Sequence, residues 1–149
     1  MNELIKFVIE NNWIISLFLA LVAIIQSATS YNLARNVFEL EVSRMISDSL
    51  NSLSNAETSA IVGLNGYDDL SCNLRKGYPE AIFEYLNVLN QACFFRSKKK
   101  ISRRFFNNIV MFRIKDVFGK KDYIALLDSN IHKHLYRIYQ SNFQNSDNE

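Results

Sequence analysis

The chain contains few of the residues that break or cross-link a polypeptide. Its 149 residues include one proline, four glycines and two cysteines. A sheet of several strands needs frequent turns built from glycine and proline, so their scarcity argues against a β fold and favours helices. Two cysteines, Cys72 and Cys93, are too few for a disulfide framework and fit a reducing compartment. We expect both to be small, buried or half-buried side chains.

Charge is absent from a long stretch near the N-terminus. No charged residue occurs between positions 11 and 34, and residues 13–25 are apolar except for Ser16. Thirteen apolar residues are fewer than the roughly twenty that cross a bilayer, so residues 26–31 must complete a span. Residues 13–31 would measure about 28 Å as a helix. An aromatic residue stands at each end, as expected at the two membrane interfaces.

We therefore predict an uncleaved membrane-spanning helix, with a buried core helix and a signal peptide as the alternatives. A signal peptide begins with a basic segment, whereas the first ten residues contain Glu3, Lys6 and Glu10. The large apolar side chains predicted to span the membrane are Trp13, Ile14, Ile15, Leu17, Phe18, Leu19, Leu21, Val22, Ile24 and Ile25.

The basic residues next to this segment predict its orientation. Lys6 is the only basic residue before it, and Arg35 and Arg44 follow it. Basic residues gather on the cytoplasmic side of membrane proteins. We expect a single-pass protein of the inner (cytoplasmic) membrane, with the N-terminus outside and the C-terminal domain in the cytoplasm.

The periodicity of the remaining chain predicts an all-α fold. One N-terminal transmembrane helix would continue into a stalk and be followed by a small cytoplasmic helical bundle. The predicted boundaries are 1–32 for the N-terminal tail and transmembrane helix, 33–54 for the stalk, 55–140 for the bundle and 141–149 for a disordered tail.

Two apolar ridges run along the predicted stalk. The first is Leu33, Val37 and Leu40, and the second is Phe38, Val42, Met45, Ile46, Leu50 and Leu53. Such a stripe could form a coiled coil between copies of the chain, or it could pack on later helices, which we favour. Polar residues 51–55 predict a break, after which Ser54 and Glu57 have the spacing of a capping box.

Three further helices are expected in the bundle. Pro79 is predicted to open the first, which runs to Phe95. The second covers residues 101–119, with Ile101, Phe105, Ile109 and Phe112 on one apolar ridge, which Phe106, Val110 and Val117 widen. The third covers residues 121–140 with an apolar stripe from Tyr123 to Ile138. Before them, Asp68 and Asp69 lie in a glycine-containing segment, where we expect turn or cap residues because a calcium loop needs more oxygen ligands.

Positive charge is concentrated in one segment. Residues 96–121 contain ten Lys or Arg and one acid, a balance of +9, whereas residues 1–95 contain five and ten, a balance of −5. A basic block of this density indicates an interaction surface or the solvated back of a core helix. The candidate surface for anionic lipid or an acidic partner consists of Arg96, Lys98, Lys99, Lys100, Arg103 and Arg104.

No pattern of catalytic residues accompanies these features. We find no nucleophile–base pair and no glycine-rich phosphate loop. His132 and His134 are two positions apart and point to different sides of a regular helix, so they do not form a metal site, and His134 is expected to pack against apolar residues. We predict a protein that is not an enzyme and has no cofactor or metal.

One helix carries a family resemblance. With Tyr85-Leu86-Asn87 followed by Leu89-Asn90-Gln91-Ala92, the chain resembles a loose group of uncharacterised bacterial and phage membrane proteins. These combine one N-terminal span with a helical cytoplasmic region, and they carry a Tyr-Leu-Asn-x-x-Glu-like helix, with Asn90 here at the Glu position. The resemblance implies a role in phage exclusion or defence and no particular functional residue.

The sequence therefore favours a membrane-anchored protein that acts through a protein partner or the membrane surface. One alternative is a membrane-disrupting effector whose transmembrane helix oligomerises through the polar residues Ser16, Gln26, Ser27 and Thr29. Another is a membrane-tethered nucleic-acid-binding module, which is least favoured because the net charge is only +2. The expected partners are membrane lipid, a second copy of the chain and a protein that the sequence does not identify.

Overall fold

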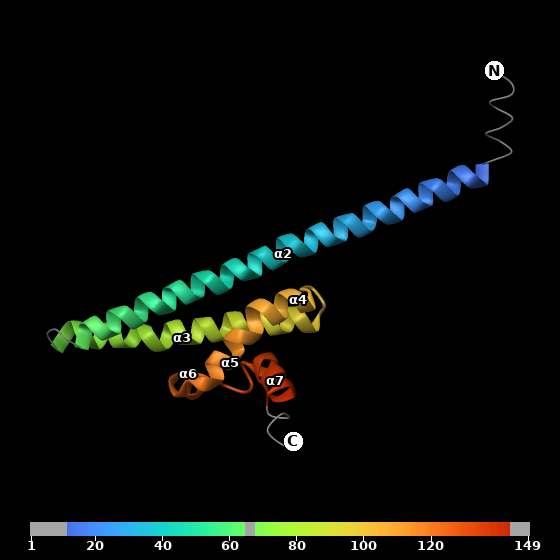
Figure 1. Cartoon of the computed structure of the whole chain (residues 1–149). Coiled ribbons are helices and arrows are strands. Elements are labelled where there is room, and N and C mark those ends of the chain that lie inside the picture. Colours follow the sequence, from blue (N-terminus) through green and yellow to red (C-terminus); the bar gives the residue numbers. More distant parts are fainter. Residues whose placement is uncertain (1–11, 65–67, 144–149) are drawn as a thin grey trace. The chain divides into compact units, whose positions relative to one another are not determined.

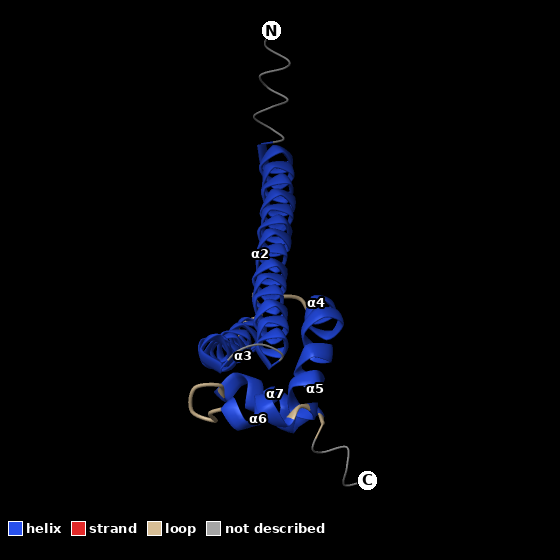
Figure 2. Cartoon of the chain, turned by 90° about the vertical axis from the view of Figure 1, so that its left-hand side faces the viewer, coloured by secondary structure: helices blue, strands red, loops and turns tan. Residues whose placement is uncertain are grey.

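The chain folds into helices joined by short connections. The computed structural model describes the backbone of residues 12–64 and 68–143, and the side chains of residues 13–60 and 77–143. The elements are α2 (Asn12–Leu64), α3 (Asp68–Ser97), α4 (Arg103–Phe105), η1 (Phe106–Val110), α5 (Met111–Gly119), α6 (Lys121–Leu126) and α7 (Lys133–Asn142), shown in Figure 1. Within these ranges the backbone forms helices and loops without any strand (Figure 2). The predicted all-α class is confirmed.

The chain divides into two compact units, with the boundary between Val37 and Phe38. The first unit contains the uncharged part of α2. The second, which we call the helical domain, contains the rest of α2 and all later elements. The predicted lead-in before residue 12 and the tail from residue 144 lie outside the described residues.

Helix α2 continues through the polar segment where we predicted a break. Ser54 lies inside the helix, and its carbonyl accepts a hydrogen bond from the Thr58 hydroxyl at 2.8 Å. The predicted break and capping box are wrong. Serine and asparagine lower helix stability by only a few tenths of a kcal/mol each in exposed positions, and Leu53, which is buried, holds this part of α2 in the core.

The second ridge of α2 packs inside the helical domain. Val42, Ile46 and Leu53 are buried, and the Phe38 ring meets the Phe95 ring edge-on with centroids 4.9 Å apart. Packing on later helices, the alternative favoured for this ridge, is confirmed. The first ridge is different, because Leu33, Val37 and Leu40 are 59–72% exposed.

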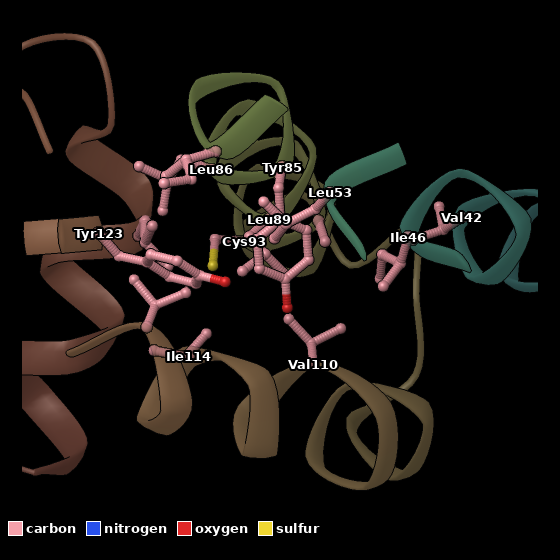
Figure 3. Close-up of a cluster of buried hydrophobic side chains, with 14 of the residues drawn as sticks. Val42, Ile46, Leu53, Tyr85, Leu86, Leu89, Cys93, Val110, Ile114 and Tyr123 are labelled. Atoms are coloured by element: carbon pink, nitrogen blue, oxygen red, sulfur yellow. The ribbon is translucent and has the colours of Figure 1, made fainter. Parts of the chain in front are cut away.

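Helix α3 is the centre of the domain. Its buried face includes Tyr85, Leu86, Leu89 and Cys93, which meet side chains from α2, η1, α5 and α6 in Figure 3. The helix begins at Asp68, so the prediction that Pro79 opens it is wrong. A helix interior tolerates one proline at the loss of one backbone hydrogen bond and some crowding of the preceding turn. The side chains of Asp68 and Asp69 lie outside the described ones.

The basic helix begins later than predicted. Ser102 is its N-cap and accepts a hydrogen bond from the Phe105 N–H at 3.1 Å. Its buried stripe consists of Phe106, Val110, Ile114 and Val117. Phe112 is 73% exposed, and its predicted place in the core is wrong. Ile101, which we used to fix the buried ridge, packs into the core from the loop before the helix and does not define that face.

The last predicted helix is interrupted. Helix α6 ends at Leu126 and α7 begins at Lys133. Tyr123 and Leu135 are buried as the apolar stripe predicted, but Ile124 and Ile131 are 43% and 49% exposed. The loop between α6 and α7 changes the direction of the chain, so residues before and after it do not share one helical face.

Candidate functional site

The predicted membrane-spanning side chains lie on an uncovered helix. Trp13, Leu17 and Ile24 are each about two-thirds exposed, and none of the helix's most apolar window is buried. In the described part of the chain this is the helix that is long and apolar enough to cross a membrane, with a mean hydropathy of 1.9. The Thr29 hydroxyl donates to the Ile25 carbonyl at 2.8 Å, so this proposed helix-contact group is hydrogen-bonded within its own helix.

The predicted basic side chains are brought together at one end of the helical domain. Arg96 lies in the last turn of α3, Lys98 to Lys100 form the connection that follows, and Arg103 and Arg104 open α4. All of them except the half-buried Arg96 are exposed. The segment 96–104 is therefore a surface feature of the domain, and we call it the basic segment.

The basic segment is fixed against α2. The Ser102 N–H donates to Glu39 Oε1 at 2.6 Å. The Lys100 ammonium lies 5.8 Å from the centre of the Phe38 ring and 5.9 Å from that of Phe95, within the range of a cation–π contact. These contacts place a segment that is remote in sequence beside the first residues of the domain.

The turn inside the basic segment has an unusual residue at its centre. The Lys100 N–H donates to the Phe95 carbonyl and the Lys99 N–H to the Arg96 carbonyl, both at 3.0 Å. This is the Schellman pattern that ends many helices. The motif requires one residue in the left-handed conformation, and here that residue is Lys99, with φ 58°. Glycine is the usual residue here because a side chain costs about 1–2 kcal/mol in that conformation.

Asn90 joins α3 to the start of α7. Its Oδ1 accepts from the N–H groups of His134 at 3.0 Å and Leu135 at 3.1 Å, and its Nδ2 donates to the Ile131 carbonyl at 3.1 Å. A helix begins with N–H groups that lack a partner within the helix. Asn90 supplies that partner from a different helix. Sequence reasoning missed this role because the capped groups are more than forty positions away.

His132 is buried at the N-cap of α7. Its Nδ1 accepts a hydrogen bond from the Asp128 N–H at 3.1 Å, and its ring meets that of Phe83 edge-on at 5.4 Å. His134 contacts the Phe94 ring at 5.1 Å, which confirms its predicted packing role. A ring nitrogen that accepts a hydrogen bond carries no proton, so the His132 side chain is the neutral imidazole at this position.

The burial of His132 makes stability depend on pH. Burial lowers the pKa of His132 below its usual 6.5, and the neighbouring Asp128 opposes this change. The unfolded chain then binds the proton more readily, so stability decreases as the pH falls below 6.5, by up to about 1.4 kcal/mol for each pH unit. We expect urea denaturation of the detergent-solubilised protein to show this loss between pH 7 and pH 5.

The variant His132→Asn keeps an oxygen acceptor near the Nδ1 position and removes the titrating group. It should be less dependent on pH, while His134→Gln should keep most of the decrease. An identical pH profile for wild type and His132→Asn would show that another group causes the decrease.

Cys93, the cysteine whose side chain the structure describes, lies on the buried face of α3. Burial raises the pKa of its thiol to about 12, so it stays protonated and unreactive at neutral pH. Its predicted role as a small buried side chain is confirmed, and Cys72 lies outside the described side chains. Among the described residues, no group of three or more His, Cys, Asp or Glu is placed to hold a metal ion.

A pocket beside the basic segment was not predicted. It has a volume of about 410 Å³, and its polar lining consists of Arg96, Arg103, Asn107 and Asn142. The two arginines belong to the predicted basic set, whereas the two asparagines come from η1 and α7. No local sequence pattern marks the two asparagines, because they meet only through the fold.

Comparison of the chain with protein-family models, curated proteins and solved structures finds no match.

Proposed function

We propose that this protein is anchored by the first part of α2 as a single-pass protein of the inner membrane. Its N-terminus would lie outside, and the helical domain would act in the cytoplasm by binding the membrane surface or a protein partner. The observation that carries the proposal is the exposed apolar surface of residues 13–25. Large contiguous apolar surfaces are rare on soluble proteins and mark membrane or protein contacts.

The position of the basic segment supports the proposed orientation. It contacts Phe38 and Glu39, which follow Tyr31 by seven and eight positions. Eight residues cover at most about 28 Å when fully extended, and about 12 Å in a helix. The chain itself thus limits how far the basic segment can lie from the C-terminal end of the proposed span. A basic residue near an anionic membrane surface contributes about 1 kcal/mol to binding.

This placement favours anionic lipid over nucleic acid as the partner of the basic segment. The biological process suggested by the resemblance, phage exclusion or defence, is part of the proposal and does not depend on any one of these residues.

Hydrogen–deuterium exchange of the full chain in lipid nanodiscs tests the surface contact. We expect the backbone of residues 98–104 to exchange at least threefold more slowly in nanodiscs containing phosphatidylglycerol than in pure phosphatidylcholine. High salt should remove the difference, because exposed charges are screened. The anchor is held by both lipids, so the comparison isolates the basic segment.

Charge reversal provides a matched control. The variant Lys98→Glu/Lys99→Glu/Arg104→Glu should lose the lipid-dependent protection. A second variant, Lys121→Glu/Lys133→Glu/Arg137→Glu, makes the same change in net charge at exposed positions outside the segment and should keep it. Equal protection in both lipids, or equal loss in both variants, would argue against a surface contact through this segment.

The second candidate function is a membrane-disrupting effector formed by several copies of the chain. The exposed ridge of Leu33, Val37 and Leu40 favours it, because an uncovered apolar ridge beside the proposed span could pack against the same ridge of another copy. Growth arrest with dye leakage after overexpression, lost in Val37→Asn/Leu40→Asn, would support this function. Overexpression without leakage would leave the passive anchor.

A further inference from the structure

The pocket beside the basic segment has the chemistry of an anion site. Arg96 and Arg103 contribute two guanidinium groups, and Asn107 and Asn142 contribute two amides. All of its lining residues are neutral or basic. A guanidinium group matches the geometry of a phosphate because it offers parallel N–H donors to two oxygens.

Both arginines keep donors for a ligand. Arg96 Nη1 donates to the Ile101 carbonyl at 3.4 Å, which holds the side chain and leaves its other N–H groups for another acceptor. Arg103 is exposed, and among the described side chains, those of residues 13–60 and 77–143, no carboxylate forms an ion pair with either arginine. The positive charge at the pocket is thus not neutralised by the described part of the protein.

The remainder of the pocket suggests what the anion is attached to. Phe106, Met111 and Ile138 give it an apolar wall beside the polar groups. The Asn107 amide can donate to and accept from hydroxyl groups, whereas Asn142 Nδ2 already donates to the Ile138 carbonyl at 2.8 Å and to the Ser141 hydroxyl at 2.9 Å. A phosphate ester of a small polyol, such as a phosphoglycerol group, would use all three kinds of surface. Inorganic phosphate would leave the apolar wall without a contact.

The backbone beside the pocket is itself irregular. Phe106 and Asn107 lie in η1, a single π-helical turn. Such turns are rare and are found frequently at functional sites. Here η1 connects α4, which carries Arg103, with α5, which carries Met111. The irregular turn therefore positions one polar and one apolar residue of the pocket.

We propose that this pocket binds the phosphate ester of a phosphoglycerol group, with Arg96 and Arg103 on the phosphate and Asn107 on the glycerol hydroxyls. The proposal rests on the proposed membrane attachment for its main ligand source, an anionic phospholipid headgroup. Ser102, the residue before Arg103, is held at Glu39, so one side of the pocket is tied to a residue that follows Tyr31 by eight positions. A soluble glycerol phosphate carries the same chemistry.

The methionines provide a reporter inside the pocket. The sequence contains three, Met1, Met45 and Met111, and only Met111 lines the pocket. Full-length protein labelled with ¹³C at the methionine methyl groups would be studied by NMR in phosphatidylcholine nanodiscs. One sample would receive glycerol 3-phosphate, and in another the nanodiscs would contain phosphatidylglycerol. We expect the Met111 methyl signal to shift with saturation while Met45 stays in place.

Three variants separate pocket binding from general charge. Arg103→Gln should weaken the binding that Met111 reports at least tenfold, and Asn107→Ala should weaken it severalfold without any change in charge. Lys99→Gly removes one positive charge outside the pocket lining, at a backbone position that suits glycine, and should weaken it less than twofold.

The outcomes distinguish the ligand source and the two proposals. A shift with phosphatidylglycerol alone identifies the lipid, and a shift with glycerol 3-phosphate alone identifies a soluble ester; either supports the pocket. An unshifted Met111 in both samples overturns it, as does equal weakening by Arg103→Gln and Lys99→Gly. Lipid-dependent exchange protection with an unshifted Met111 would retain the proposed function and remove only the pocket.

Discussion

Replacing Asn90 with alanine should lower the free energy of unfolding of the helical domain by about 3 kcal/mol, because three hydrogen bonds disappear at one position. In two of them the Asn90 side chain accepts from the N–H groups of His134 and Leu135, and in the third it donates to the Ile131 carbonyl. Without Asn90 the N–H groups of His134 and Leu135 are left partly buried and without this acceptor. Circular dichroism of the purified protein should show the melting temperature falling by roughly 10 °C or more.

Asn90→Asp is the matched control for this prediction. It keeps the acceptor for the two N–H groups and adds a negative charge at a helix N-terminus, which is favourable. It loses only the bond to Ile131, so we expect a cost of about 1 kcal/mol. If alanine and aspartate reduce stability equally, the two accepted hydrogen bonds do not stabilise α7.

The second large effect concerns the proposed anchor. Leu21→Lys/Ile24→Lys places two charges near the middle of the proposed span, at a cost of about 3 kcal/mol each for membrane insertion. We expect most of this variant to leave the membrane fraction on carbonate extraction, whereas the wild type remains. The quantity measured is the fraction of protein in the washed membrane pellet.

The control for the anchor uses the same kind of substitution elsewhere on α2. Val37→Lys/Leu40→Lys also exchanges two exposed apolar residues for lysine, at positions beyond the proposed span. It should stay in the pellet. Extraction of the wild type, or release of both variants to the same extent, would contradict an anchor formed by residues 13–31.

Much of the fold could be predicted because the relevant signals are local. Absence of charge defined the apolar part of α2, and spacings of three and four placed Leu86, Leu89 and Cys93 on the buried face of α3. The errors arose where tertiary packing outweighed local preference. The polar residues around Ser54 remain helical because Leu53 is buried, and the loop before His132 interrupts a stripe that was periodic enough to suggest one helix.

In the candidate site, too, local signals identified some residues and missed others. Its basic residues are contiguous in sequence and could be identified from composition. Asn107 and Asn142 could not, since they are 35 positions apart and contribute only when η1 and α7 meet. Asn90 is a similar case. Its sequence neighbourhood suggested a family motif, whereas in the structure its contacts explain why α7 begins where it does.

The left-handed turn at Lys99 has a consequence for how this domain could change. Glycine adopts this backbone conformation at a lower cost than a residue with a side chain. Lysine at position 99 therefore lowers the stability of the turn while it adds a positive charge to the basic segment. If the charge serves the proposed contact, weaker selection for that contact would leave glycine as the better residue. The residue at position 99 thus affects both the stability of the domain and the proposed contact. Measuring stability and contact for each substitution at Lys99 would show how strongly the two are linked.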